Sequence, residues 1–109
     1  MIRIRINGEP GEVRGFLIWG HAGEAPYGED IVCASVSALS TAALVGLTEM
    51  VPGSAKYRLL PEGLIYCRLE RDIPKEDGMK AQAIVSTMVL GLAAVWGLYG
   101  DYIDFAYRR

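Results

Sequence analysis

The chain has 109 residues, of which 51% are hydrophobic and 22% charged, and its formal net charge is −2. This length fits one domain, residues 1–109, and the composition excludes a disordered chain. The small negative net charge gives no reason to expect nucleic acid as a direct partner. Two cysteines are too few for a disulfide framework, and two arginines interrupt the first apolar stretch, so no signal peptide is expected. We therefore expect a cytoplasmic protein with free thiols.

The first half of the chain predicts a hairpin followed by a helix. In residues 2–6, isoleucine and arginine alternate, which predicts a strand with one buried side and one solvent-facing side. The turn signal NGEPG follows, and residues 13–19 predict the second strand. Asp30 is a suitable N-cap for a helix that runs to about Met50, where a Pro-Gly pair stops it.

The second half predicts the same order of elements and one further strand. Residues 56–60 and 64–69 form the next hairpin, a helix runs from about Pro74 to about Tyr99, and residues 102–107 form the last strand. The order ββαββαβ predicts an α+β fold, a two-layer sandwich whose mostly antiparallel sheet carries both helices on one face. The second helix is apolar nearly all round, so we expect a homodimer, unless the first helix covers the apolar strip.

Two uncharged stretches, residues 31–48 and 81–100, approach the length of a membrane span. Both contain small or polar residues, and the amphipathic strands need these helices as a core. We therefore expect no membrane as a partner, with a two-span membrane protein as the alternative.

The chain's only histidine, His21, follows the second predicted strand, and Cys33 lies near the predicted helix start. If Asp30 caps that helix, Cys33 is its third residue, where unpaired N–H groups and the helix dipole favour a thiolate and an oxyanion. Residues 22–29 are long enough to bring His21 back as general base. The alternative is a buried cysteine and a solvated histidine, because this spacing alone is a weak pattern.

The neighbours of this pair each have a structural and a functional interpretation. Asp30 caps the helix or orients the histidine. Ser37 lies one turn beyond the cysteine and either touches the site or bonds its own helix backbone. Gly23 and Gly28 are ordinary turn residues or hinges of a loop that closes on a substrate.

The remaining chemistry-bearing residues predict no further site. Cys67 shares a strand face with apolar residues and is predicted to be a core residue. One histidine, one cysteine and some carboxylates offer no compact ligand spacing, so we expect no metal. No glycine-rich phosphate motif is present, and we expect no cofactor.

Three motifs together are specific: G-H-A-G at 20–23, G-x-D-I-V-C-A at 28–34 and V-S-A-L at 36–39. They resemble the bacterial ribosomal-processing cysteine protease family, Prp, and the resemblance spans essentially the whole chain. It implies a cytosolic, homodimeric endopeptidase. Such an enzyme removes a short N-terminal extension, ending in a hydrophobic, aromatic-containing motif, from protein twenty-seven of the large ribosomal subunit, which permits ribosome assembly.

By motif position, the resemblance implies that Cys33 is the nucleophile and His21 the general base, with Asp30 and Ser37 beside them. It also implies a mobile loop over residues 22–29. The thiolate would attack the scissile carbonyl, the histidine would protonate the leaving amine, and water would hydrolyse the thioester.

An enzyme that acts on an extended peptide also needs an apolar groove, for which Phe16, Ile18 and Trp19 are candidates by proximity. Two other functions stay open. One is a non-catalytic, ribosome-associated peptide-binding module, and the other is a different thiol hydrolase acting on small substrates.

Overall fold

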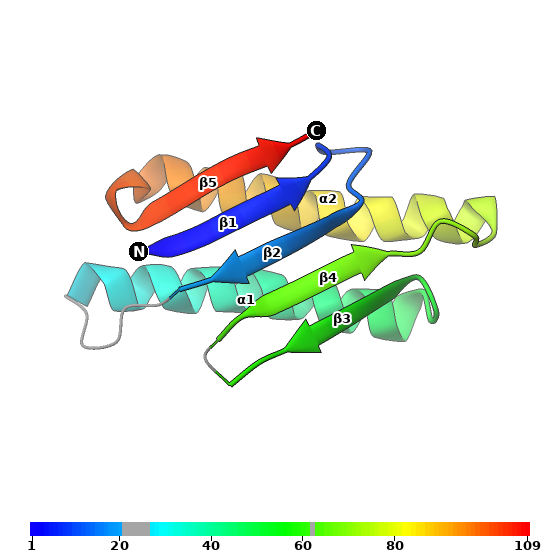
Figure 1. The fold of residues 1–109 in the computed structure, drawn as a ribbon, viewed down its shortest axis with the longest axis horizontal. Helices are drawn as coiled ribbons and strands as arrows, with labels where there is room; N and C mark the ends of the chain where they lie inside the picture. Colours follow the sequence, from blue (N-terminus) through cyan, green and yellow to red (C-terminus); the bar gives the residue numbers. More distant parts are fainter. Residues whose placement is uncertain (21–26, 62) are drawn as a thin grey trace.

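The structure, a computed structural model, describes residues 1–20, 27–61 and 63–109, and for residues 27–30 it describes only the backbone. It contains a five-stranded sheet with two helices on one face (Figure 1). The elements are β1 (Ile2–Asn7), β2 (Gly15–Trp19), α1 (Tyr27–Met50), β3 (Ala55–Leu59), β4 (Ile65–Leu69), α2 (Lys75–Leu98), a 3₁₀ turn (Gly100–Tyr102) and β5 (Ile103–Arg108). The predicted order ββαββαβ and the two-layer α+β sandwich are confirmed.

The strands lie in the order β3-β4-β2-β1-β5. Three pairs are antiparallel, and the fourth, β1 with β5, is parallel, with Ile2 beside Ile103. The sheet is therefore mostly antiparallel, as predicted. The parallel pair arises because the chain returns through α2, the kind of long crossover that a parallel connection requires.

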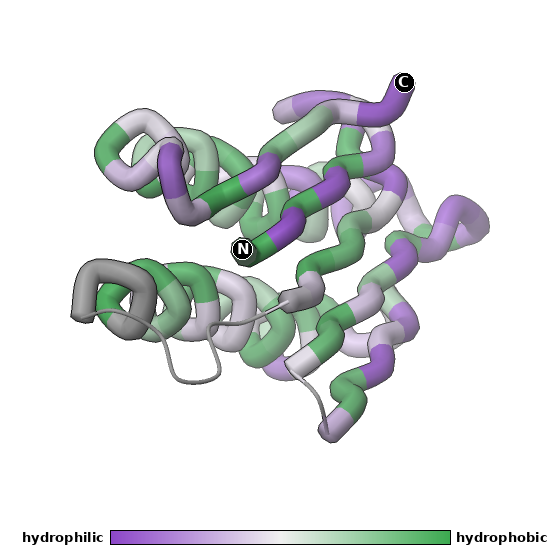
Figure 2. Tube along the Cα trace, turned by 60° about the vertical axis from the view of Figure 1, so that its left-hand side comes forward, coloured by the Kyte–Doolittle hydropathy of each residue, from purple (hydrophilic) through white to green (hydrophobic). Residues whose placement is uncertain are grey.

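The core lies between the sheet and the two helices. The three isoleucines of β1 are at most 2% exposed, and the arginines between them point to the uncovered face. Figure 2 shows this alternation of hydrophilic and hydrophobic residues along β1. Cys67 is fully buried, which confirms its predicted place in the core. The period-two pattern thus decides which side of the sheet the helices cover.

The start of α1 differs from the prediction. The helix begins at Tyr27, three residues before the predicted N-cap, so Asp30 lies within the helix and does not cap it. Gly28 likewise has a helical backbone, so it is neither a turn residue nor a loop hinge. An acidic residue stabilises a helix in its first turn as well as at its cap, which is why Asp30 did not fix the start of the helix. The other boundaries agree with the prediction to within two residues.

The outer sides of both helices are exposed and apolar. By length and composition alone, Ile31–Met50 and Lys75–Leu98 are each long and apolar enough to cross a membrane. In the structure both pack on the sheet, yet only 33% and 28% of their apolar windows are buried. Large apolar side chains that remain exposed are Ile31, Val45 and Met50 on α1, and Met79, Leu90, Trp96 and Leu98 on α2.

Candidate active site

Cys33 lies on the side of α1 that faces the sheet. Its side chain is half-buried against the core, and its thiol is free. Because α1 begins at Tyr27, Cys33 is the seventh residue of the helix and not the third, as the sequence had predicted. The half-buried side chain leaves the thiol accessible. The thiol lies in the second turn of the helix.

This position changes which groups can activate the thiol. Cys33 is six positions after the first helical residue, a distance of about 9 Å along the axis. The unpaired N–H groups belong to the first turn, and the effect of the helix dipole also falls off within that turn. The backbone N–H of Cys33 is thus inside the hydrogen-bonded ladder. The prediction that it lies among free helix N–H groups was wrong.

A small hollow of about 230 Å³ opens beside Cys33, between α1 and the ends of three strands. It is lined by Ile2, Ile18, Gly20, Cys33, Val36, Ser37, Ser40, Pro61, Gly63 and Ile65. Most of the wall is aliphatic, from β1, β2 and β4, and the turn between β3 and β4 forms its rim. An apolar side chain placed there would lie next to the Cys33 thiol.

Two hydroxyl groups interrupt the apolar wall. Ser40 is fully buried, and its Oγ donates to the carbonyl oxygen of Val36 at 2.8 Å, which satisfies its donor. Ser37 is exposed and lies one helical turn after Cys33, which places it on the same side of α1. The structure therefore brings together two of the predicted site residues, Cys33 and Ser37, and leaves Ser37 accessible to a bound molecule.

Gly20 forms the part of the hollow where β2 ends. Its φ is +85°, a conformation that side chains other than glycine rarely adopt, and a Cβ there would collide with the carbonyl oxygen of Met1. Only glycine allows the chain to leave β2 in this direction. Because Gly20 directly precedes His21 in the sequence, the direction of this exit sets where the next segment of the chain begins.

The other predicted site residues are placed as follows. His21 and Gly23 lie outside the described residues, so their predicted roles stay predictions. Asp30 and Gly28 lie in the first turn of α1, by their backbone. Asp30 is three residues, close to one turn, before Cys33.

Of the three groove candidates, one is confirmed as lining the hollow. Ile18 belongs to its wall, whereas Phe16 is fully buried in the core and cannot touch a substrate. Trp19 lies on the opposite face of the sheet, where the Arg5 guanidinium sits 5.4 Å from its ring centre. Sequence analysis missed the contributions of Pro61 and Ile65, which come from the second hairpin and meet Cys33 only in the folded chain.

The second cysteine cannot serve as a nucleophile in the folded protein. Cys67 lies in the middle of β4 with no exposed surface, and burial raises its pKa to about 12. Larger hollows, of about 550, 600 and 490 Å³, lie elsewhere in the described part of the chain, and none of the three is lined by Cys33. The described part of the chain holds no cluster of three or more His, Cys, Asp or Glu side chains that could bind a metal ion. Accessibility of the thiol, and not the size of a hollow, selects the Cys33 site.

Comparison with known proteins agrees with a thiol hydrolase. The family model described as cysteine protease Prp matches residues 1–104. This chain therefore belongs to the cysteine protease Prp family. It is a cysteine protease.

Solved structures share the whole fold. The essential ribosomal processing protease Prp from Staphylococcus aureus, in complex with a substrate peptide, is 24% identical, with a TM-score of 0.83 over 99% of this chain and 100% of that one. The same protease with a covalently linked product peptide is 25% identical, with a TM-score of 0.80 over the same shares of both chains. SMU.848 from Streptococcus mutans is 23% identical, with a TM-score of 0.82 over 99% of this chain and 94% of that one. No curated protein matches the chain.

Proposed function

We propose that this protein is a cysteine endopeptidase that removes the short N-terminal extension of protein twenty-seven of the large ribosomal subunit, and so permits ribosome assembly. Membership of the cysteine protease Prp family supports the class of reaction. A structural relative that is a ribosomal processing protease supports the class of substrate. The observation that carries the proposal for this chain is the half-buried Cys33 thiol beside an aliphatic hollow.

In the proposed mechanism, Cys33 is the nucleophile and His21 its general base. The Cys33 thiol gives its proton to His21, and the thiolate attacks the scissile carbonyl carbon to form a tetrahedral oxyanion. His21 then gives the proton to the leaving amine, and the C–N bond breaks. Water, deprotonated by His21, hydrolyses the thioester and releases the acid product. Because Cys33 lies in the second turn of α1, the helix dipole helps the thiolate little, and the pairing with His21 carries its activation.

The oxyanion requires a hydrogen-bond donor near the thiol. The backbone N–H of Cys33 is bonded within α1, but the accessible hydroxyl of Ser37 lines the same hollow. We assign Ser37 to this supporting role. Asp30, one turn before Cys33, is assigned to orienting His21, as the motif implies.

The size and lining of the hollow suit one apolar side chain of an extended peptide. Pockets that enclose a whole drug-sized ligand measure about 300–1,000 Å³, which is larger than the 230 Å³ beside Cys33. The rest of the peptide would then lie outside the hollow, as an endopeptidase requires. A hydrophobic motif at the end of the extension matches the aliphatic walls formed by Ile2, Ile18 and Ile65.

We further propose a homodimer that acts in the cytoplasm. Several large apolar side chains on the outer sides of α1 and α2 are more than half exposed, among them Val45, Leu90 and Leu98. A second copy that covers this surface would remove it from water. Light scattering coupled to size exclusion would give twice the 11.9 kDa chain mass if this is right.

The test is cleavage of the extended ribosomal protein precursor, read by intact-mass spectrometry. The wild-type protein should produce a single new N-terminus after the extension. Cys33→Ala should produce none. Cys67→Ala is the matched control, because it removes the other thiol from the core and should still cleave at a temperature where it is folded.

Three results would contradict the proposal. If Cys33→Ala cleaves like the wild type, the nucleophile is wrongly assigned. If folded wild-type protein leaves the precursor intact but hydrolyses other peptides, the substrate is wrong. Failure to cleave any peptide while hydrolysing small thioesters or amides would instead indicate a small-substrate thiol hydrolase.

A further inference from the structure

The face of the sheet that the helices leave uncovered is strongly basic. Side chains alternate between the two faces of a strand, and cross-strand partners share a face, so the register of the five strands places each residue. Six of the uncovered positions are basic: Arg3, Arg5, Lys56, Arg58, Arg68 and Arg108. One uncovered strand position, Asp104, is acidic, and it is held by Arg5 at 2.8 Å.

The charges of the protein are distributed unevenly between this face and the other residues. Glu70 follows β4 directly and pairs with Arg68 at 3.6 Å and Lys56 at 3.8 Å. The six basic strand residues together with Asp104 and Glu70 carry a charge of +4, whereas the whole chain carries −2, so all other residues together carry −6. The sequence expectation of no nucleic-acid partner relied on the net charge, which conceals this separation. The distribution of charge, and not its sum, decides which partners a surface attracts.

Aromatic rings lie among the basic groups. Tyr66 is in the middle of β4, 41% exposed, beside Arg58 of the neighbouring strand. Trp19, on β2, is half-buried beneath the Arg5 guanidinium. A planar ring on a basic surface can stack on a nucleobase. A ligand that carries only phosphate groups or carboxylates would use the basic groups and not the rings.

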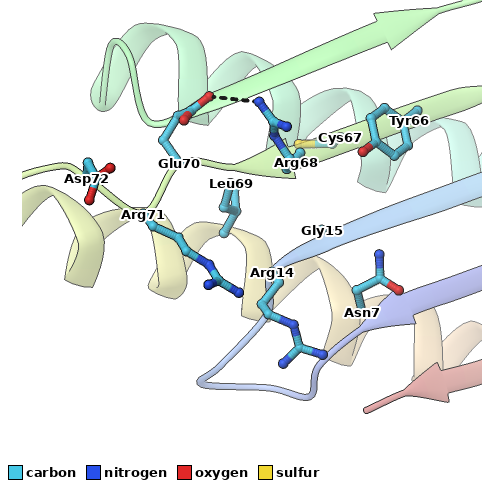
Figure 3. A pocket seen from close by; sticks show the side chains of 10 residues that line it. All are labelled: Asn7, Arg14, Gly15, Tyr66, Cys67, Arg68, Leu69, Glu70, Arg71 and Asp72. Atoms are coloured by element: carbon cyan, nitrogen blue, oxygen red, sulfur yellow. Dashed lines mark ion pairs between the residues drawn. The ribbon is translucent and has the colours of Figure 1, made fainter.

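The same face contains a hollow of about 550 Å³, at the end of β4 (Figure 3). Arg14, Arg68 and Arg71 line it together with Tyr66, so that three guanidinium groups and one ring border the same space. Two carboxylates, Glu70 and Asp72, also line it, and Glu70 already pairs with Arg68. The hollow is therefore wide enough for a base, with cations at its border for the adjoining phosphates.

We propose that this uncovered face, defined by the six basic residues and Tyr66, binds single-stranded RNA. Five strands spaced about 4.8 Å apart give an open platform about 19 Å wide. This platform is not shaped to enter a groove of a double helix. Single strands are the form whose bases are free to stack on such a platform. The Cys33 hollow is lined by Ile2, Ile18 and Ile65, which face the opposite, helix-covered side of the sheet, so RNA and a peptide can bind together.

The experiment is fluorescence anisotropy with a labelled 12-nucleotide oligouridylate, titrated with the full chain at 50 and 200 mM NaCl. Arg58→Gln/Arg68→Gln should weaken binding about tenfold at the lower salt, and should make the salt dependence shallower by about 1.4 logarithmic units per decade, since each single-strand phosphate contact contributes about 0.7. The matched control is Lys75→Gln/Lys80→Gln on α2, which removes the same charge from elsewhere and should leave both quantities close to the wild type.

Tyr66→Leu separates stacking from charge. It should weaken binding by about five- to a hundredfold without changing the salt dependence, because stacking on one ring contributes that much per base. Its control is Tyr57→Leu, because Tyr57 is 42% exposed on β3 but faces the other side of the sheet. Thermal melts of all four variants establish that each is folded.

Three outcomes would overturn the proposal. The first is no binding by the wild type at about 100 μM protein and 50 mM NaCl. The second is an equal loss in the two double variants, which would mean nonspecific attraction by any cation. The third is competition by polyglutamate of similar length as strong as that by RNA, with no effect of Tyr66→Leu, which would make this an acidic-protein surface.

Discussion

The two cysteines of this chain contact the same core but differ in what surrounds them. Cys33 lies on α1, half-buried, and faces a hollow that opens to solvent. Cys67 lies in the middle of β4, between Phe16 and Tyr57 of the adjacent strands, with no exposed surface. The residue type is identical, so the difference in chemistry comes only from position. A thiol becomes a candidate nucleophile where the fold leaves it a path to water and substrate.

The largest expected difference between the two thiols is in reactivity. A pKa of about 12 against an ordinary 9.0 lowers the thiolate fraction of Cys67 about a thousandfold at pH 8. Iodoacetamide should therefore modify Cys33 first and leave Cys67 unmodified until the protein unfolds. Time-resolved peptide mass spectrometry measures both sites in one sample. Comparable modification rates at the two cysteines in native buffer would mean that Cys67 is not buried in the core.

Substitution of Gly20, which lines the Cys33 hollow, should impair both the fold and catalysis. Gly20→Ala combines an unfavourable φ with a collision at the Met1 carbonyl oxygen, and should destabilise the fold by about 2 kcal/mol or more and reduce peptide cleavage strongly. Gly53→Ala is the control, since Gly53 has a similar φ of +83° with no neighbouring atom within 4 Å. The Gly53→Ala variant should have a free energy of unfolding about 1 kcal/mol below that of the wild type and should keep its cleavage activity. Urea unfolding and cleavage rates test both, and equal effects would remove the special role of Gly20.

Alkaline pH should destabilise the protein through Cys67. Because its folded pKa is raised, the neutral thiol stabilises the fold fully below pH 9, and this stabilisation is lost as pH rises from about 9 towards 12. The expected slope from this group is about 1.4 kcal/mol per pH unit. Urea unfolding of the wild type and Cys67→Val between pH 8 and 10.5 isolates the contribution. Parallel pH profiles of the two proteins would contradict it.

The smallest effect is expected from an exposed titrating group. A hydrogen bond from Arg5, with the charges of Arg5 and Arg3, lowers the pKa of Asp104 below its usual 3.8. The ionised carboxylate therefore stabilises the fold above pH 4, and this contribution is lost as pH falls through the lowered pKa. Asp104→Asn should have a slightly lower free energy of unfolding than the wild type at pH 7. Its free energy of unfolding should also change less as the pH falls below 4. Solvent screens this pair, so the change should be smaller than that of Gly20→Ala.

Local patterns predicted most of the fold. The alternation in residues 2–6 predicted both the strand and its buried side, and two long apolar stretches predicted the helices. The start of α1 was missed because Asp30 could serve equally as a cap or within the first turn. The pairing of β1 with β5 could not be predicted, because no local signal specifies which strand a distant segment will join.

The site was predicted in part. A short motif identified Cys33 and Ser37, which the fold places on one hollow. Its far wall, from Pro61 and Ile65, joins Cys33 only through tertiary structure, so spacing along the chain gave no sign of it. The alternation of side chains along β2 decides between two of the groove candidates. Ile18 and Trp19 are adjacent in β2, so they must face opposite sides, and only one of them could line the hollow.

The parallel contact between β1 and β5 has a consequence for the synthesis of the chain. Ile2 and Ile103 are partners although 101 positions separate them, and Ile2 also lines the hollow beside Cys33. At about 5–20 residues per second, translation takes roughly 5–20 s to reach the strand that covers this edge of β1. During that interval the first strand has one unpaired edge, the kind of surface on which nascent chains aggregate or recruit chaperones. The exposed edge of β1 is therefore protected only after β5 has been synthesised.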